Sequence, residues 1–267
     1  MRPTTYRAAV LAAGLCLSPA ALGGTLTTFT FTSDATSQIS SSKTYTAKAD
    51  PGSSGTGPAT VNGVVFDRGA LSTSAGSAVG VDTYTAPGVT YTIPAGAGQV
   101  GPLAFNGGNG FDLPGGSSAQ LLTDMVFTSN GAGQGNVTRL TFTGLTAGQQ
   151  YSARIYYRAW DAATARPSTI TFDEDGAGPL GASAGSVDED AGNNSDGIAN
   201  VLAYNYTAVS NGAGGALPLI VNFTADTGNN SWHLYGVTNE VVPEPATAGV
   251  LGVAGLGLLA RRRRQRR

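Results

Sequence analysis

The chain has little of the chemistry that holds small disulfide-linked or metal-linked domains together. Among its 267 residues there is one cysteine, Cys16, and one histidine, His233. A disulfide within one chain needs two cysteines, and protein zinc sites are built from several cysteine and histidine ligands. The sequence therefore excludes an intrachain disulfide and predicts no zinc site, so stability must come from a large core.

Charged residues are also scarce, at 12% of the chain, and they are unevenly distributed. Residues 24–240 hold seven basic and sixteen acidic residues, a net charge of −9, whereas the last seven residues are arginines and one glutamine. Binding to nucleic acid requires a basic surface. The central region therefore predicts no nucleic-acid partner and is compatible with divalent cations or neutral glycans.

Long helical patterns are absent between residues 25 and 239, where short alternating runs of Thr, Val, Tyr and Phe are separated by glycine-rich turns. This pattern predicts an all-β fold, an antiparallel, jelly-roll-like β-sandwich spanning residues 24–240. Two long loops are expected, over 94–119 and 174–197. We expect strands near 25–32, 43–48, 61–66, 81–85, 89–93, 121–128, 136–143, 149–160, 167–173, 199–208, 217–224 and 231–238.

The two strongest strand patterns, 136–143 and 149–160, flank the short segment 144–148, which begins and ends with glycine. This arrangement predicts a hairpin. Alternation then assigns two faces to the second strand. The expected core face carries Tyr151, Ala153, Ile155 and Tyr157.

The opposite face of that strand carries Arg154, Tyr156, Arg158 and Trp160. Aromatic rings stack on sugars, and guanidinium groups hold hydroxyls, so this face is our candidate surface for an extracellular polysaccharide. The alternative is that a loop covers the face, with the arginines stacked on the aromatic rings and paired to acidic residues.

Residues 1–23 have the features of a signal peptide. Arg2 and Arg7 precede an apolar run over 8–17, Pro19 breaks the helix, and small residues follow. We expect signal peptidase to cleave after Gly23, with cleavage after Ala20 as the alternative. The run is too short to span a bilayer.

Residues 241–267 form a second segment of distinct composition. The motif Pro243, Glu244 and Pro245 precedes a 15-residue apolar run over 246–260, and a basic cluster ends the chain. A helix over this run would be about 22 Å long, short of the ~30 Å bilayer core, which suits temporary membrane retention. The positive-inside rule keeps the basic cluster cytoplasmic. It consists of Arg261, Arg262, Arg263, Arg264, Arg266 and Arg267.

This order of motif, apolar helix and arginine cluster resembles the PEP-CTERM sorting signal. The resemblance implies a substrate of an exosortase, a membrane enzyme that cleaves near the motif. It also implies a Gram-negative host that makes extracellular polysaccharide. The protein would be retained at the inner membrane until processed and then reach the cell surface or matrix. An ordinary tail anchor is the alternative. The resemblance says little about residues 24–240.

Two acidic segments, 173–175 and 188–196, supply hard oxygen ligands of the kind that Ca²⁺ accepts. We expect them to approach each other. The alternative is a solvated acidic loop. The candidate Ca²⁺ ligands are Asp173, Asp175, Asp188, Asp190 and Asp196.

No catalytic residue is predicted. Ser183 lies in a G-x-S-x-G match, with Asp188 and His233 following in hydrolase order, but loop sequence flanks it on both sides. We expect a non-enzymatic protein of the cell envelope or extracellular matrix that is glycan-binding or adhesive. Two alternatives remain open: an exported polysaccharide hydrolase and a purely structural matrix component.

Overall fold

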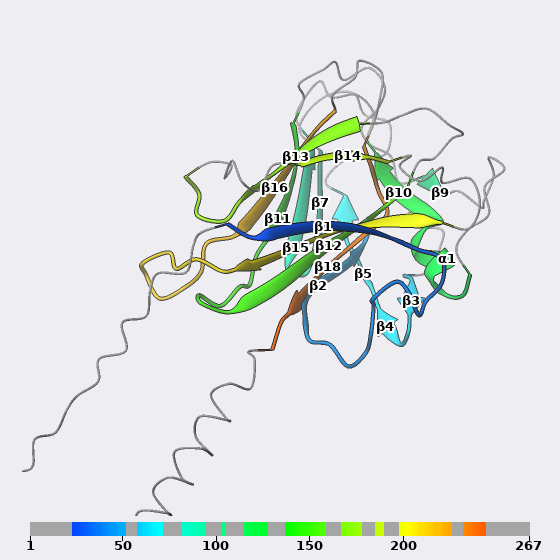
Figure 1. Ribbon diagram of the computed structural model, residues 1–267, viewed down its shortest axis with the longest axis horizontal. Coiled ribbons are helices and arrows are strands. Elements are labelled where there is room, and N and C mark those ends of the chain that lie inside the picture. The colour runs from blue at the N-terminus through cyan, green and yellow to red at the C-terminus, as the bar shows by residue number, and fades with distance from the viewer. Residues whose placement is uncertain are drawn as a thin grey trace, which may run out of the picture.

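The structure is a computed structural model that describes residues 23–51, 58–71, 82–93, 103–104, 115–127, 137–158, 167–177, 185–189, 198–225 and 232–243. These residues form β-strands almost throughout, with one short helix, α1 (Ser118–Leu121). The β-rich prediction is confirmed, and two large sheets face each other as in a sandwich (Figure 1).

The first large sheet has six strands in the order β1-β15-β12-β18-β2-β5. Neighbours are antiparallel except for the short parallel contact between β2 and β5. The strands are β1 (Thr25–Phe31), β15 (Ala199–Thr207), β12 (Gln150–Tyr157), β18 (Gly236–Val241), β2 (Tyr45–Asp50) and β5 (Asp67–Arg68).

The second large sheet has seven strands in the order β14-β13-β16-β11-β8-β7-β6. They are β14 (Gly185–Asp188), β13 (Pro167–Asp173), β16 (Leu219–Ala225), β11 (Val137–Phe142), β8 (Val89–Ile93), β7 (Asp82–Ala86) and β6 (Ala70–Leu71). The remaining strands are β17 (His233–Leu234), β10 (Asp124–Phe127) and β9 (Leu103–Ala104), which form a small sheet, and the β3 (Thr60–Val61) and β4 (Val64–Val65) pair.

The main core lies between the two large sheets. It contains the four β12 residues assigned to the core face from the sequence, together with alternate residues of β11 and β16. Aromatic rings from the two sheets meet directly: Phe172 of β13 and Tyr204 of β15 stack with centroids 3.7 Å apart. Because each strand places every second side chain inward, the alternation seen in the sequence becomes this core.

A second apolar cluster covers the outer face of the six-stranded sheet. Tyr156 and Val201 project into it from β12 and β15, and Leu121 of α1 and Val61 of β3 pack over them. Phe31 meets Tyr156 edge to face at 5.9 Å. This face of the sheet is therefore buried as well.

The predicted hairpin across residues 144–148 is wrong. β11 pairs with β8 and β16, whereas β12 pairs with β15 and β18 in the other sheet. The segment therefore crosses from one sheet to the other. Both strands carry an apolar face directed at the same core, and an arch between the sheets satisfies this requirement as well as a hairpin does.

The two expected long loops also contain regular structure. β9 lies in the range 94–119 and α1 begins there, and β14 lies in 174–197, where it adds an edge strand beside β13. Their polar and glycine-rich sequences concealed them, because edge strands and single helical turns bury few side chains.

Candidate functional site

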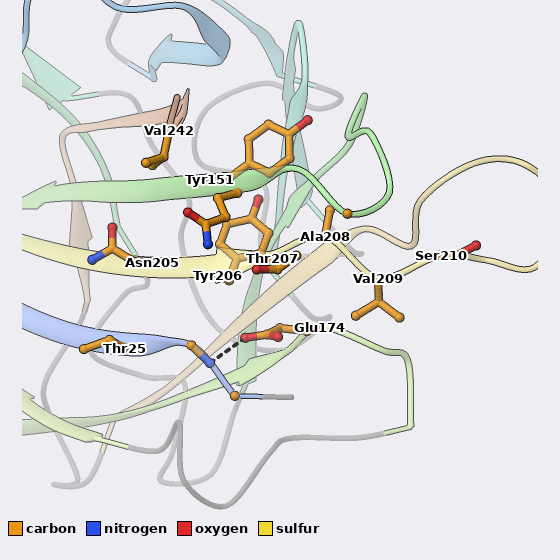
Figure 2. A pocket seen from close by; sticks show the side chains of 14 residues that line it. Thr25, Tyr151, Glu174, Asn205, Tyr206, Thr207, Ala208, Val209, Ser210 and Val242 are labelled. Atoms are coloured by element: carbon orange, nitrogen blue, oxygen red, sulfur yellow. Dashed lines mark hydrogen bonds between the residues drawn. The ribbon is translucent and has the colours of Figure 1, made fainter. Parts of the chain in front are cut away.

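A cavity of about 780 Å³ opens at one end of the sandwich, where four strands of the six-stranded sheet begin or end. The strand register fixes this convergence: Thr25 at the start of β1 lies opposite Asn205, Asn205 opposite Ser152, and Ser152 opposite Glu240 near the end of β18. Figure 2 shows the lining side chains. They include Thr25, Gln150, Tyr151, Glu174, Asn205, Tyr206 and Val242.

Glu174 is the acidic residue of this cavity. It follows β13, and its side chain is almost fully buried. Its Oε1 atom accepts a hydrogen bond of 2.5 Å from the Tyr204 hydroxyl and one of 2.9 Å from the Gly24 backbone nitrogen, the dashed line in Figure 2. The same nitrogen donates to the Tyr204 hydroxyl oxygen at 2.9 Å. These three groups form a closed triangle of hydrogen bonds.

Two tyrosines, Tyr151 and Tyr206, line the cavity, and a third stacks behind them. Tyr151 and Tyr206 stack with centroids 5.7 Å apart, and Tyr204 continues the stack at 5.9 Å from Tyr206. The Tyr206 hydroxyl donates to Asn239 Oδ1, and burial raises the pKa of this phenol. The three rings are buried, so they support the cavity without offering an open stacking surface.

The C-terminal side of the cavity is closed by Val242. Its backbone N–H donates to the Gln150 carbonyl, and its carbonyl accepts from the Gln149 side-chain amide, both at 2.9 Å. Pro243 follows directly and is exposed. The sandwich therefore ends where the proline-glutamate-proline motif begins, while Glu244, Pro245 and the terminal arginines lie outside the described residues.

The predicted ligand face is covered rather than open. Arg154 and Tyr156 are buried, and Arg158 is buried with its guanidinium carbon 5.8 Å from the centroid of the Tyr235 ring. Trp160 lies outside the described residues. The three placed side chains cannot form an exposed platform, because the second apolar cluster packs over their face of the sheet.

Arg154 instead belongs to a buried ionic cluster. Its Nη1 atom lies 2.5 Å from Glu240 Oε2, and Lys43 Nζ lies 2.8 Å from the same oxygen. Arg154 and Glu240 are 8% and 7% exposed. Both carboxylate and guanidinium are thus paired, as buried charges must be.

The candidate Ca²⁺ ligands are not brought together. The register pairs Asp188 with Pro167 at the start of β13, whereas Asp173 ends the same strand, six residues or roughly 20 Å away. Asp173 Oδ1 accepts the backbone N–H groups of Asp175 and Gly176, which is a local turn. Asp190 and Asp196 lie outside the described residues, and the part of the chain that is described contains no group of three metal-binding side chains.

A buried pair that the sequence did not predict involves the single histidine. His233 Nδ1 lies 2.8 Å from Glu189 Oε2, and the His233 backbone N–H donates to Glu189 Oε1 at 2.5 Å. Both side chains are buried. Nothing in the spacing of Glu189 and His233, 44 residues apart, signals this contact.

Residues 241–267 match the family model described as the PEP-CTERM protein-sorting motif. The chain carries a PEP-CTERM sorting signal. This motif implies an exported protein that an exosortase processes and that is anchored at the membrane until then. The match begins at the last residue of β18, so the signal follows the sandwich without a linker. Within the described ranges, no helix is long and apolar enough to cross a membrane.

Comparison with known proteins adds little about the sandwich of this PEP-CTERM protein. No curated protein matches it. Among solved structures, the ANX2 ectodomain from Arabidopsis thaliana is 14% identical with a TM-score of 0.41, over 53% of this chain and 40% of that one. The arabinose-bound MgGH51 α-L-arabinofuranosidase is 9% identical with a TM-score of 0.36, over 64% of this chain and 25% of that one. This chain thus spans less than half of either, and scores of this size assign no function.

Proposed function

We propose that this chain is a non-enzymatic protein of the bacterial cell envelope or extracellular matrix. It is exported through a cleaved signal peptide, held at the inner membrane by its C-terminal helix, and released to the surface by exosortase cleavage near Pro243. The jelly-roll-like sandwich is the part that remains outside the cell. The PEP-CTERM motif supports the sorting steps.

The non-enzymatic assignment rests on the contacts of the buried carboxylates. Each one in the described residues is engaged in holding the fold, whereas a glycoside hydrolase needs two carboxyl groups facing a substrate. Asp50 accepts the Ala59 N–H and lies near Arg68. The other four carboxylates are also engaged: Asp173 accepts hydrogen bonds within its turn, Glu174 belongs to the triangle with Tyr204 and Gly24, Glu189 pairs with His233, and Glu240 belongs to the ionic cluster.

Binding of an extracellular polysaccharide is a second candidate function, and the cavity favours it. Gln150, Asn205 and Thr207 provide amide and hydroxyl groups around a space large enough for a sugar unit. This location differs from the face of Arg154, Tyr156 and Arg158 that the sequence indicated, since those side chains are buried. A purely structural matrix component needs no such ligand.

The test uses the full-length gene in a host with an exosortase and in the same host lacking it. We expect the processed protein at the surface without its arginine cluster in the first host, and membrane-retained protein that keeps the cluster in the second, measured by fractionation and intact mass. Processed protein incubated with the host polysaccharide should release no new reducing ends. Release of reducing ends would overturn the proposal in favour of a hydrolase, and cosedimentation with the polysaccharide would support the binding role.

A further inference from the structure

We propose that the α-ammonium group created at Gly24 by signal-peptide removal forms an ion pair with the buried carboxylate of Glu174. The mature N-terminus is then held in the wall of the cavity at the end of the sandwich, where Gly24 already lies. This inference rests on the export step of the proposed function and on cleavage after Gly23.

The hydrogen-bond count at the Gly24 nitrogen is the first argument. Two acceptors, Glu174 Oε1 and the Tyr204 hydroxyl oxygen, each lie 2.9 Å from it. A peptide nitrogen carries one hydrogen, which these two acceptors would have to share. An α-ammonium group carries three hydrogens and can donate a separate one to each acceptor. The surroundings of this nitrogen therefore suit a chain terminus better than a chain interior.

The charge on Glu174 is the second argument. Its side chain is 3% exposed, and no cationic side chain pairs with it within the described part of the chain. Before cleavage its carboxylate has only neutral donors, the Tyr204 hydroxyl and the Gly24 amide. A buried carboxylate is costly unless an opposite charge compensates it. Cleavage would supply that charge at the nitrogen already in contact.

The third argument is the fit of glycine at this position. A Cβ atom on Gly24 would lie 2.4 Å from the Asn205 carbonyl oxygen and 2.5 Å from Cζ of Tyr204, closer than Cβ atoms approach other atoms in proteins. Glycine therefore fits this position without displacing Asn205 or Tyr204, the residue that completes the triangle. Cleavage after Ala20 would instead leave Gly24 inside the chain, with an ordinary amide at the triangle.

The position of Gly23 and Gly24 at the cavity suits both the uncleaved precursor and the mature chain. Gly23 and Gly24 line its wall, and Gly23 is exposed, so the precursor chain can leave the sandwich at this point. The sandwich can therefore form around the uncleaved chain and gain the ion pair afterwards. Processing would complete the fold without rearranging it.

The test measures the α-amino pKa in protein exported and processed from the full-length gene. Trace acetylation over a range of pH, read by mass spectrometry of the N-terminal peptide, reports this pKa while most molecules stay unmodified. We expect it to lie roughly one pH unit or more higher in the natural protein than in Glu174→Gln. Asp175→Asn, which neutralises the neighbouring carboxylate in the same loop, is the matched control and should leave the value unchanged.

Tyr204→Phe is the second variant in case Glu174→Gln does not fold, because it keeps the ring stacked on Phe172 and removes only the hydroxyl. It should also lower the α-amino pKa, but by less than Glu174→Gln does. Equal values in all folded variants of a chain that begins at Gly24 would overturn the inference and leave export intact. A mature chain that begins at Ala21 would do the same, whereas a retained Met1 would refute export itself.

Discussion

At the scale of single residues, buried charges gave the largest difference between expectation and structure. Alternation correctly assigned Arg154 and Tyr156 to the face of β12 opposite the main core. It could not show that the face is covered, because Phe31, Val61 and Leu121, which help to cover it, are distant in sequence. A strand with a polar outer face reads the same in a sequence whether water or a second layer lies against it.

Replacement of Glu240 by Gln should be strongly destabilising. The amide cannot neutralise Arg154, which would then be a buried cation without its charge partner, at a cost of about 3 kcal/mol in the free energy of unfolding. Lys43→Met removes the more exposed cation from the same carboxylate and should cost about 1 kcal/mol or less. Urea denaturation of both variants checks this order. Equal losses would contradict a dominant role for the Arg154–Glu240 pair.

At the scale of elements, the strand positions were largely predictable and their pairing was not. Strands β11 and β12 lie where period-two alternation placed them, since one residue in two must face the core. Their separation into two sheets depends on partners more than 40 residues away in the chain, such as Thr138 with Phe223. Alternation reports which face of a strand is buried but carries no information on its neighbour.

Asp34 holds the short helix α1 against the loop after β1, and its replacement by Ala should release both. Its carboxylate accepts the Ser117 N–H at 2.9 Å, the Ser117 hydroxyl at 2.6 Å and the Ser118 N–H at 2.6 Å. Loss of these bonds should lower the free energy of unfolding by about 1–2 kcal/mol, measured by thermal or urea denaturation. Asp34 and Glu240 share no hydrogen-bond or ion-pair partner among the described residues, so the loss should add to that of Glu240→Gln.

The contribution of Asp34 should also depend on pH. Partial burial raises the pKa of this carboxyl, but the hydrogen bonds from Ser117 and Ser118 outweigh that effect and lower the pKa overall. Its stabilisation is therefore fully present above the unfolded-state pKa of about 3.9 and is lost as the pH falls through the folded-state value. The difference in stability between the natural protein and Asp34→Ala should shrink below about pH 4. A constant difference down to pH 2 or so would contradict this assignment.

At the scale of the whole molecule, the sorting signal was legible in the sequence, but the nearness of the two ends of the sandwich was not. A signal peptide and a sorting signal are local patterns of charge and apolarity. That Gly24 and Val242 line one cavity follows only from the register of β1, β15, β12 and β18. Three strand spacings of about 4.8 Å place the two ends roughly 14 Å apart laterally. On the processing proposed above, signal peptidase and exosortase would act at the same end of the sandwich.

The buried tyrosines should set the highest pH at which the protein stays folded. Burial raises the pKa of five phenols well above the ordinary value of about 10, so they stay neutral in the folded state. Their stabilisation is fully present below pH 10 or so, where the unfolded chain also keeps its phenols neutral, and is lost as the pH rises above it. The five phenols belong to Tyr84, Tyr91, Tyr156, Tyr157 and Tyr206.

Each such phenol lowers the free energy of unfolding by about 1.4 kcal/mol per pH unit above 10, so five together remove about 7 kcal/mol per unit. Typical domains have about 5–15 kcal/mol in total, so unfolding should be complete within about two pH units. We expect tyrosinate absorbance and loss of the β-sheet circular dichroism signal to rise together in one cooperative step. If most of the tyrosinate signal developed while the sheet signal stayed native, these rings would be titrating in the folded protein and the core would be more open to solvent than its packing indicates.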